Sequence, residues 1–356
     1  METIWVGMSG GVDSSVAAAL LLEQGHTVVG VTLRLREGAQ GDVDDARRVC
    51  DALDIEHRVI DLTDRFSGCV MDEFAREYRA GRTPNPCITC NRTIKFGALL
   101  DAALGSGADA VATGHYARVE YDPERGRHLL YRVDSPKDQS YVLYSLDQRQ
   151  LGHARFPIAA MDKQAVRAAA RARSLPVAEK GDSMEICFLP DGDYAAFVET
   201  RTGSCPPGPF VDEEGRILGT HRGIIHYTVG QRKGLGTAFG RPMYVVRIDP
   251  EKNAVVLGEE GRQYAVSLTA AGVRYIPFDR PAGPLRAQVR IRYQAKPADA
   301  TVYPLPAGRA RVAFDRPQRA AAPGQSAVFY DGDLVLGGGI IESTDGPDLG
   351  GGRADF

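Results

Sequence analysis

Long apolar runs are missing from this chain of 356 residues, and none approaches the length of a membrane-spanning helix. The first eight residues contain Glu2 and no basic residue, so we see no secretory signal and expect a cytoplasmic protein with no membrane partner. Cysteine is also scarce. Six cysteines in a cytosolic chain of this size indicate reactive thiols or a metal site and argue against a disulfide scaffold.

Two familiar phosphate-binding patterns are absent from the glycine-rich start of the chain. Walker A requires a lysine after its last glycine, and no lysine follows Gly7, Gly10 or Gly11. The dinucleotide fingerprint G-x-G-x-x-G requires a spacing that these three glycines do not have. Both of these phosphate-binding loops are therefore excluded at the start of the chain.

What the start of the chain does contain is the stretch VGMSGGVDSS. Residues 4–6 predict a short buried strand, and residues 12–24 predict a helix that stops at Gly25. The turn between them directs backbone N–H groups and the positive end of a helix dipole at one point, which suits a phosphate. The Ser9 and Ser14 hydroxyls add donors, and Asp13 can hold a magnesium ion.

Strand-like and helix-like runs alternate through the first half of the chain. The almost wholly apolar strands at 27–33, 57–62 and 108–113 and the helices at 44–53, 64–79 and 91–104 predict a doubly wound α/β parallel sheet. Ligands of such sheets bind at the carboxyl ends of the strands, where the opening loop and Gly114-His115 lie. Leu33, at the end of the second strand, would cover an adenine.

The second half of the chain reads as β structure. Turn-rich segments at 202–215 and 276–284 indicate boundaries, so we expect a catalytic domain at 1–199, a central β domain at 200–275, a C-terminal β-barrel at 276–343 and a flexible tail at 344–356. Residues 286–296 alternate strictly, with Arg286, Arg290, Arg292 and Lys296 on one face. Residues 286–319 carry +6 although the whole chain carries −3. We expect this strand to bind the phosphate backbone of RNA.

The cysteines divide into two groups. Cys90 lies beside a predicted helix start at Asn91, with Arg92 and Lys95 close by, so its thiol pKa should be lowered, making it the best nucleophile. Cys50 and Cys69 fall inside predicted helices and are expected to be buried and inert. Cys187 stands in an apolar run, which by itself favours a core position.

Eight motifs in family order make the chain resemble the tRNA-specific 2-thiouridylases over residues 3–340: GMSGGVDSS, PNPC-x-x-CN, ATGHYAR, KDQSYVLY, MEICFLP, HYTVGQRKGLG, IRYQ and PGQ. The first is the S-G-G-x-D-S "PP-loop" of ATP pyrophosphatases. The resemblance implies a PP-loop domain of the adenine nucleotide α-hydrolase type, then a small central β domain and a C-terminal β-barrel. It also implies replacement of O2 of the tRNA wobble uridine by sulfur, with ATP as the adenylating agent and a cysteine persulfide as the sulfur source.

The resemblance also assigns roles to residues. ATP, with Mg²⁺, would be bound by Gly7, Met8, Ser9, Gly10, Gly11, Val12, Asp13, Ser14, Leu33 and Gly114. Cys90 would be the nucleophile and Cys187 the persulfide carrier, and the two could form a disulfide. The target base would be bordered by Asn85, Pro86 and Cys87, and the tRNA anticodon arm would be contacted by His115, Lys137, Asp138, Gln139, Arg292, Tyr293 and Gln325. The sulfur would come from a relay carrier protein or a cysteine desulfurase.

This sequence departs from the better-studied members at two positions. Cys87 stands where they have an aspartate, and Leu33 stands where some have a methionine. The extra thiol leaves two mechanisms open. Either Cys90 and Cys187 suffice, or Cys87, Cys90 and Cys187 hold a [4Fe–4S] cluster whose open iron carries hydrosulfide. Two other functions share parts of the pattern: another PP-loop synthetase would not need the cysteines, and a non-enzymatic RNA-binding iron–sulfur protein would not need the opening loop.

Overall fold

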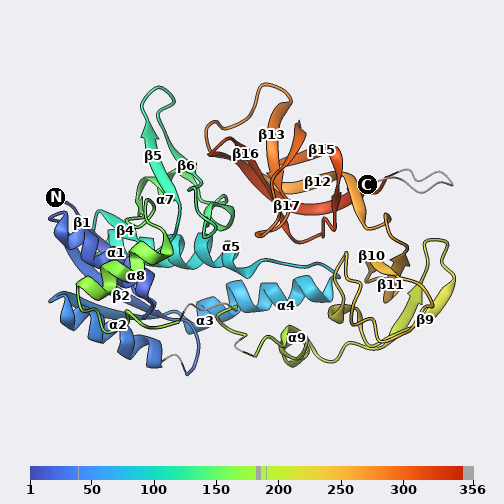
Figure 1. Ribbon diagram of the computed structural model, residues 1–356, viewed down its shortest axis with the longest axis horizontal. Helices are drawn as coiled ribbons and strands as arrows, with labels where there is room; N and C mark the ends of the chain where they lie inside the picture. Colours follow the sequence, from blue (N-terminus) through green and yellow to red (C-terminus); the bar gives the residue numbers. More distant parts are fainter. Residues whose placement is uncertain (39, 182–185, 190, 348–356) are drawn as a thin grey trace.

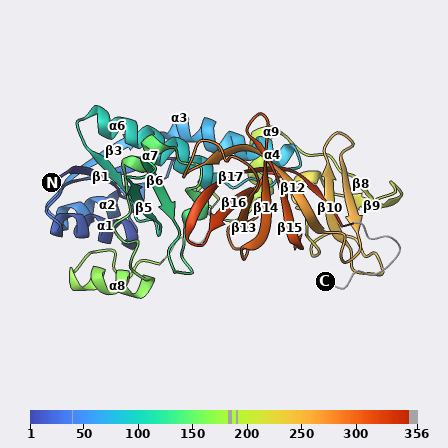
Figure 2. The ribbon, with the colours of Figure 1, turned by 90° about the horizontal axis from the view of Figure 1, so that it is seen from above.

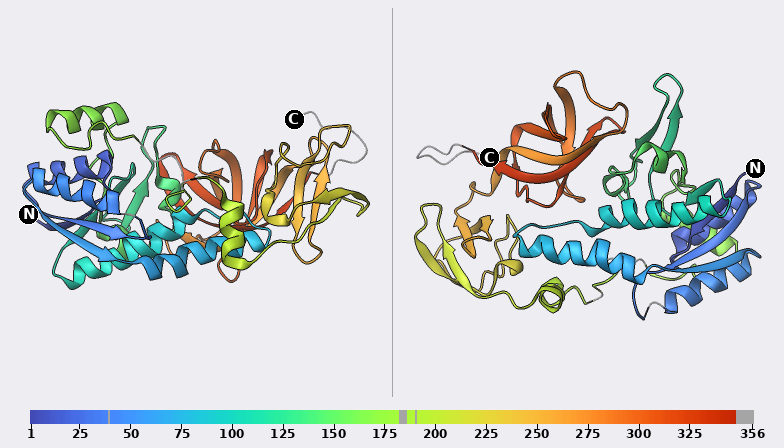
Figure 3. Two further views of the ribbon diagram at one scale, coloured as in Figure 1. Left: turned by 90° about the horizontal axis from the view of Figure 1, so that it is seen from below. Right: turned by 180° about the vertical axis from the view of Figure 1, so that it is seen from behind.

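The computed structural model describes residues 1–38, 40–181, 186–189 and 191–347 of the chain. The molecule is elongated, with an α/β unit at the N-terminal end and two β units toward the other (Figure 1). Seen from above, the C-terminal barrel lies between the α/β unit and the small central sheet (Figure 2). Helical segments run lengthwise between the two ends, as the view from behind shows (Figure 3).

A five-stranded sheet forms the centre of the N-terminal unit. All its neighbouring strands are parallel, and their order is β3-β2-β1-β4-β7. The strands are β1 (Thr3–Gly7), β2 (Thr27–Arg34), β3 (Glu56–Asp61), β4 (Ala110–Ala112) and β7 (Ala154–Arg155). Ile4 and Val6 of the central strand are fully buried, as expected for a strand covered on both faces. The predicted doubly wound parallel sheet is confirmed.

The helices lie mostly in the first two hundred residues. The α-helices are α1 (Val12–Glu23), α2 (Gln40–Ala52), α3 (Thr63–Phe66), α4 (Asp72–Arg79), α5 (Pro86–Cys90), α6 (Leu99–Gly105), α7 (Gln148–Gly152), α8 (Lys163–Ala172) and α9 (Tyr194–Thr202). Two π-helical segments, η1 (Ser67–Met71) and η2 (Asn91–Ala98), join α3 to α4 and α5 to α6. Short 3-10 turns occur at η3 (Ser140–Val142) and η4 (Ile224–His226). No helix in the described ranges is long and apolar enough to cross a membrane.

The helix expected to start at Asn91 begins five residues earlier, at Pro86. Asn85, not Asn91, is its N-cap, and the Asn85 side chain accepts a hydrogen bond from the Cys87 N–H at 3.1 Å. Proline suits the first helical position because its fixed φ is helical and its missing N–H is not needed there. Cys90 therefore lies inside the helix and not at its N-terminus.

A hairpin that the sequence reading missed links the two halves of the molecule. Its strands β5 (Arg118–Asp122) and β6 (Arg127–Tyr131) are antiparallel, and β6 pairs with the C-terminal sheet where Tyr131 faces Leu334. An ion pair between Arg132 Nε and Asp333 Oδ1 at 2.9 Å continues the contact. The α/β unit thus extends the sheet of the barrel.

The central β unit is a four-stranded sheet of order β10-β11-β8-β9. Its strands are β8 (Gly208–Val211), β9 (Ile217–His221), β10 (Tyr244–Asp249) and β11 (Ala254–Gly258). The last two form an antiparallel pair. Phe210, Val245 and Val255 are fully buried in the hydrophobic cluster that joins this sheet to α4 and α9.

Six strands close the C-terminal barrel. Its strand order is β12-β15-β14-β13-β16-β17, and a further pairing of β12 with β17 completes the ring. The strands are β12 (Tyr264–Tyr275), β13 (Leu285–Arg290), β14 (Ala298–Leu305), β15 (Arg309–Arg319), β16 (Ser326–Asp331) and β17 (Leu334–Asp345). The predicted barrel is confirmed, and its first strand begins ahead of the boundary expected at 276.

Two expectations about this unit are wrong. The basic strand expected over 286–296 ends at Arg290, because residues 291–297 form a turn in which the Ala295 N–H bonds to the Arg292 carbonyl at 3.1 Å. The flexible tail expected from 344 is wrong for its first two residues, since Thr344 and Asp345 pair with Leu268 and Ser267 in the barrel. The remainder of that tail, residues 348–356, lies outside the described residues.

Candidate active site

The loop between β1 and α1 has the geometry of an anion cradle. Gly10 adopts a φ of +69°, and Gly11 caps α1 without any side-chain hydrogen bond, so the first amides of the helix are not capped by a side chain. The Ser9 and Ser14 hydroxyl oxygens lie 3.2 Å apart beside them. These donors converge where the helix dipole is positive, which is the arrangement that binds phosphate.

Two glycines around this loop are needed for close packing. A Cβ atom on Gly114 would lie 2.7 Å from the Ser14 nitrogen, so Gly114 lets the end of β4 approach the start of α1. A Cβ atom on Gly10 would lie 2.7 Å from the Asp42 carbonyl oxygen. Gly10 thus packs the loop against α2 and lines neither of the two cavities described below.

Asp13 has partners that the sequence did not indicate. The Lys163 ammonium lies 2.8 Å from both oxygens of the Asp13 carboxylate, and the Tyr116 hydroxyl donates to one of them at 2.8 Å. Lys163 comes from α8, which packs on α1. The contact is made by tertiary packing, so no local sequence pattern could have found it.

A cavity of about 240 Å³ opens at the carboxyl ends of β1, β2 and β4. Seven of the residues predicted to bind ATP line it, namely Gly7, Met8, Ser9, Asp13, Ser14, Leu33 and Gly114. Val31, Leu33 and Leu35 give it an apolar lining, which suits an adenine ring. We call this space the nucleotide cavity.

A second cavity of about 490 Å³ adjoins the first and is called the thiol cavity below. Cys87, Cys90 and Cys187 all line it, together with Pro86 and the loop residues Gly11 and Val12. Cys187 is exposed, so its expected core position is wrong. The structure thus brings the three candidate thiols to one space beside the opening loop.

Loss of hydration governs the pKa of these thiols. Burial raises the pKa of Cys90 to about 12, and the Lys95 ammonium opposes this rise by less. The pKa values of Cys87 and Cys187 are raised by the same cause, although both residues keep exposed surface. The lowered pKa expected for Cys90 is therefore wrong, because Cys90 lies inside a helix and 8% of its surface remains exposed.

The described residues contain no group of three or more His, Cys, Asp or Glu side chains placed to hold a metal ion. Cys87, Cys90 and Cys187 therefore line one cavity without forming a ligand set for a [4Fe–4S] cluster. All six cysteines are free thiols.

The remaining cysteines lie away from this site. Cys50 is fully buried as expected, and burial raises its pKa to about 11. Cys69 is exposed on η1, so its expected burial is wrong. Cys205 is buried in the cluster between α9 and the central sheet.

The residues expected to contact tRNA occupy different environments. His115 is buried and bonds to the Thr113 hydroxyl at 2.7 Å, and burial lowers its pKa well below 6.5. It lines the nucleotide cavity, whereas Lys137 lines the thiol cavity and Gln139 lines both. Asp138 is buried and accepts a hydrogen bond from the Ser140 hydroxyl at 2.9 Å. A contact of each with tRNA remains a prediction.

The barrel contributes three further candidates. Arg292 is exposed in the turn after β13 and forms no ion pair within the described ranges. Tyr293 is half-buried against Tyr141, with 6.0 Å between the ring centroids. Loss of hydration raises the pKa of Tyr293, and the Cys87 thiol adds a small rise, so this turn reaches toward the thiol cavity. The Gln325 amide donates to the Thr83 carbonyl at 2.8 Å and holds the segment that leads to Asn85.

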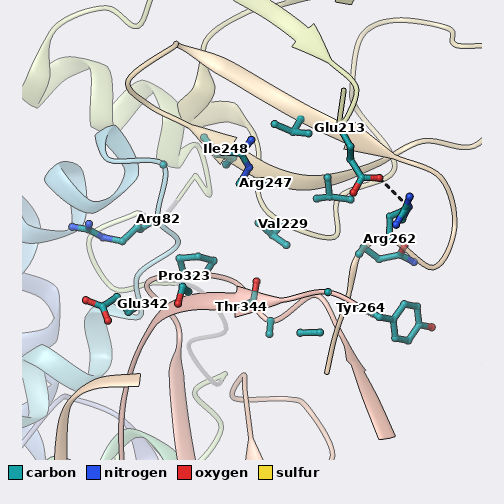
Figure 4. Close-up of a pocket in the computed structure, with 18 of the residues that line it drawn as sticks. Arg82, Glu213, Val229, Arg247, Ile248, Arg262, Tyr264, Pro323, Glu342 and Thr344 are labelled. Carbon is teal, nitrogen blue, oxygen red and sulfur yellow. Dashed lines mark ion pairs between the residues drawn. The ribbon is translucent and has the colours of Figure 1, made fainter. Parts of the chain in front are cut away.

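The described part of the chain has a third cavity of about 520 Å³, between the end of α4, the central sheet and the barrel. Figure 4 shows Arg262 reaching Glu213 across its rim, and this ion pair measures 3.0 Å. None of the predicted site residues lines this cavity.

Comparison with known proteins covers nearly the whole chain. Three family models match: the tRNA methyl transferase HUP domain at residues 2–191, the tRNA methyl transferase PRC-barrel domain at 195–259 and the aminomethyltransferase beta-barrel domain at 266–341. The solved U34-tRNA thiolase NcsA from Methanococcus maripaludis, with its [4Fe-4S] cluster, is 18% identical with a TM-score of 0.35, over 57% of this chain and 68% of that one. That likeness is too slight to support an argument.

Curated relatives are much closer. The tRNA-specific 2-thiouridylase MnmA of Acetivibrio thermocellus is 53% identical over 96% of this chain and 99% of that protein. The corresponding protein of Moorella thermoacetica is 51% identical over 95% of this chain and 99% of its own length. The chain therefore belongs to the family of tRNA-specific 2-thiouridylases.

Proposed function

We propose that the two adjoining cavities carry out the two halves of tRNA 2-thiouridylation, with adenylation in the nucleotide cavity and sulfur transfer in the thiol cavity. One observation carries the proposal. The cavities share seven lining residues, Met8, Ser9, Asp13, Leu33, Leu35, Lys95 and Gln139, so the phosphate loop and the thiols open to one space. A uracil base inserted into this space would reach both the phosphate loop and the thiols.

In the first half-reaction, O2 of the wobble uridine attacks the α-phosphorus of ATP, and pyrophosphate leaves. The uracil oxygen is a poor leaving group until it carries the adenylyl group, which later departs as AMP. The amides at the start of α1 and the Ser9 and Ser14 hydroxyls bind the phosphates. The thiol cavity adds the cations Arg36, Lys95, Lys137, Lys163 and Lys180.

Asp13 fits a magnesium site of the kind that uses one carboxylate together with substrate phosphates. Its carboxylate lies at the edge shared by both cavities, and a bound Mg²⁺ would replace the Lys163 ammonium as the cation on this carboxylate, both of whose oxygens Lys163 now contacts. When bound, Mg²⁺ neutralises the phosphate charge. Lys163 and Tyr116 hold the Asp13 carboxylate at this edge.

In the second half-reaction, the terminal sulfur of a persulfide on Cys187 attacks C2 of the adenylated uridine, and AMP leaves with the oxygen. The Cys90 thiolate then attacks Sγ of Cys187. This breaks the bond to the transferred sulfur, which stays on C2, and leaves a Cys90–Cys187 disulfide. An external dithiol returns two electrons and restores both thiols. Cys87, Asn85 and Pro86 border the base.

The sulfur enters as a persulfide from a relay carrier protein or a cysteine desulfurase, and the substrate is the anticodon arm of a tRNA. Single-stranded loop bases can be splayed into a pocket of this kind. The exposed Arg292 and Lys296 of the turn after β13 supply phosphate contacts near the cavity. We place the reaction in the cytoplasm.

The test is incubation of the protein with tRNA, ATP, Mg²⁺ and a sulfide source, followed by mass spectrometry of the tRNA nucleosides. We expect 2-thiouridine and tRNA-dependent release of pyrophosphate. Pyrophosphate release without thiolation would point to another PP-loop synthetase. Binding of tRNA with neither product would point to an RNA-binding protein without this activity.

A further inference from the structure

Lys95 lines both the nucleotide cavity and the thiol cavity. It lies on the π-helical segment η2, five residues after Cys90, and its side chain is half-buried. Short π-helical segments inside α-helices are frequent at functional sites. Among the described residues that line both cavities, Lys95 is the one with a cationic side chain.

Two other lysines that line the thiol cavity are held by carboxylates. Lys163 is paired with Asp13 at 2.8 Å, and Lys180 is paired with Asp45 at 2.6 Å. Within the described ranges, no hydrogen bond or ion pair engages the Lys95 ammonium. A half-buried cation where the two cavities meet is therefore left to face whatever charge enters them.

We propose that Lys95 is a catalytic residue that contacts the α-phosphate during adenylation and the sulfur nucleophile during sulfur transfer. This rests on the proposed function and adds a residue to it. Both half-reactions develop negative charge where the cavities meet, first on pyrophosphate and then on AMP and the attacking sulfur. A cation at that point stabilises each in turn.

The electrostatics of the free protein agree with this position. The Lys95 charge lowers the pKa of Cys87, of Cys90 and of Cys187 against the larger effect of burial. It also lowers the pKa of His115 in the nucleotide cavity. One ammonium therefore acts on groups in both cavities.

The test compares Lys95→Met, which keeps the length of the side chain and removes the charge, with Lys95→Arg, which keeps the charge. Arg92→Met is the matched control, because Arg92 is a cation on the same helical segment and lines neither cavity. Thermal unfolding of each variant confirms the fold. Single-turnover pyrophosphate release and 2-thiouridine formation are then measured separately, and site-resolved iodoacetamide labelling of the three thiols is followed without tRNA or ATP.

We expect Lys95→Met to slow both half-reactions by about 100-fold, the cost of losing one preorganised charge partner. Labelling of Cys90 and Cys187 at a fixed pH should fall several-fold, while Lys95→Arg and Arg92→Met stay within about tenfold of the wild type. Loss of one half-reaction alone, or unchanged rates, would overturn the proposal. If the wild-type protein makes no 2-thiouridine, the proposed function fails, and the labelling comparison still decides whether Lys95 acts on the thiols.

Discussion

Arg290 Nη1 lies 3.0 Å from Asp138 Oδ2, and this pair joins the barrel to the α/β unit. Both side chains are nearly buried, with 14% of Arg290 and 10% of Asp138 exposed. The Arg290 guanidinium also lies over the rings of Tyr141 and Tyr330, at 5.7 and 6.0 Å from their centroids. Arg290 is thus a structural cation and does not belong to a solvated RNA-binding face.

The first prediction concerns stability. Arg290→Met should lower the free energy of unfolding by about 3–5 kcal/mol, because it leaves the Asp138 carboxylate buried and unpaired. Arg286→Met on the same strand is the control. Its pair with Asp315 is exposed at 61% and 48%, so its loss should cost at most about 1 kcal/mol. Denaturant unfolding measures both, and equal costs would contradict the buried role of Arg290.

The second prediction concerns tRNA binding. Arg292→Ala should weaken tRNA binding and reduce the slope of log K against log salt by about one, because one phosphate contact is lost. Lys296→Ala should act alike, since both residues are exposed in the turn after β13. Arg216→Ala is the control, because Arg216 is an exposed arginine of the central β unit that pairs with Asp212. A slope that stays constant in both variants would make this turn an ordinary solvated surface.

The third prediction concerns the opening loop. Asp13→Asn should reduce tRNA-dependent pyrophosphate release by at least about 100-fold, with tRNA affinity nearly unchanged, because the magnesium ligand is lost. Glu23→Gln at the other end of α1 is the matched control, since its carboxylate pairs with Arg173 at the surface. Gly10→Val is a poorer test, because its side chain would strike the Asp42 carbonyl. Normal release from Asp13→Asn would refute the loop assignment.

The fourth prediction concerns pH. A pKa of about 12 for Cys90 means that the folded protein favours the neutral thiol at neutral pH. Alkylation of Cys90 in nucleotide-free protein should therefore rise about tenfold per pH unit between pH 7 and 10, without a plateau. Exposed Cys69 should react first, and buried Cys50 should follow the slow course of Cys90. Peptide mass spectrometry resolves each site, and a Cys90 plateau below pH 9 would show that its thiol is activated.

The fifth prediction concerns Cys87. If sulfur moves only through Cys187 and Cys90, Cys87→Ala should thiolate tRNA at close to the wild-type rate in iron-free buffer. Cys90→Ala and Cys187→Ala should each abolish thiolation. Anaerobic reconstitution with iron and sulfide, followed by iron analysis, completes the test. If iron increases the rate of tRNA thiolation and Cys87→Ala abolishes this increase, the cluster is established. The three thiols would then have to move closer together to bind it.

The strand–loop–helix at the start of the chain could be read from sequence because its geometry is local. Gly10 adopts a positive φ that glycine tolerates well, and the apolar runs before and after the loop favour a strand and a helix by their own composition. The order of elements likewise predicted the parallel sheet, and the closing β-rich run predicted the barrel. The motifs then identified the family, which the relatives confirm.

What sequence reading missed depends on burial and on distant partners. Cys90 looked activated because its neighbours Arg92 and Lys95 are cations, yet desolvation outweighs Lys95. The alternation of residues around Arg290 indicates which face of the strand is polar. It does not indicate whether water or another part of the protein covers that face. The sequence by itself determined the nucleotide loop and the family. Only the tertiary structure decided which charges face solvent, because solvation is set by whatever packs on a residue from elsewhere in the chain.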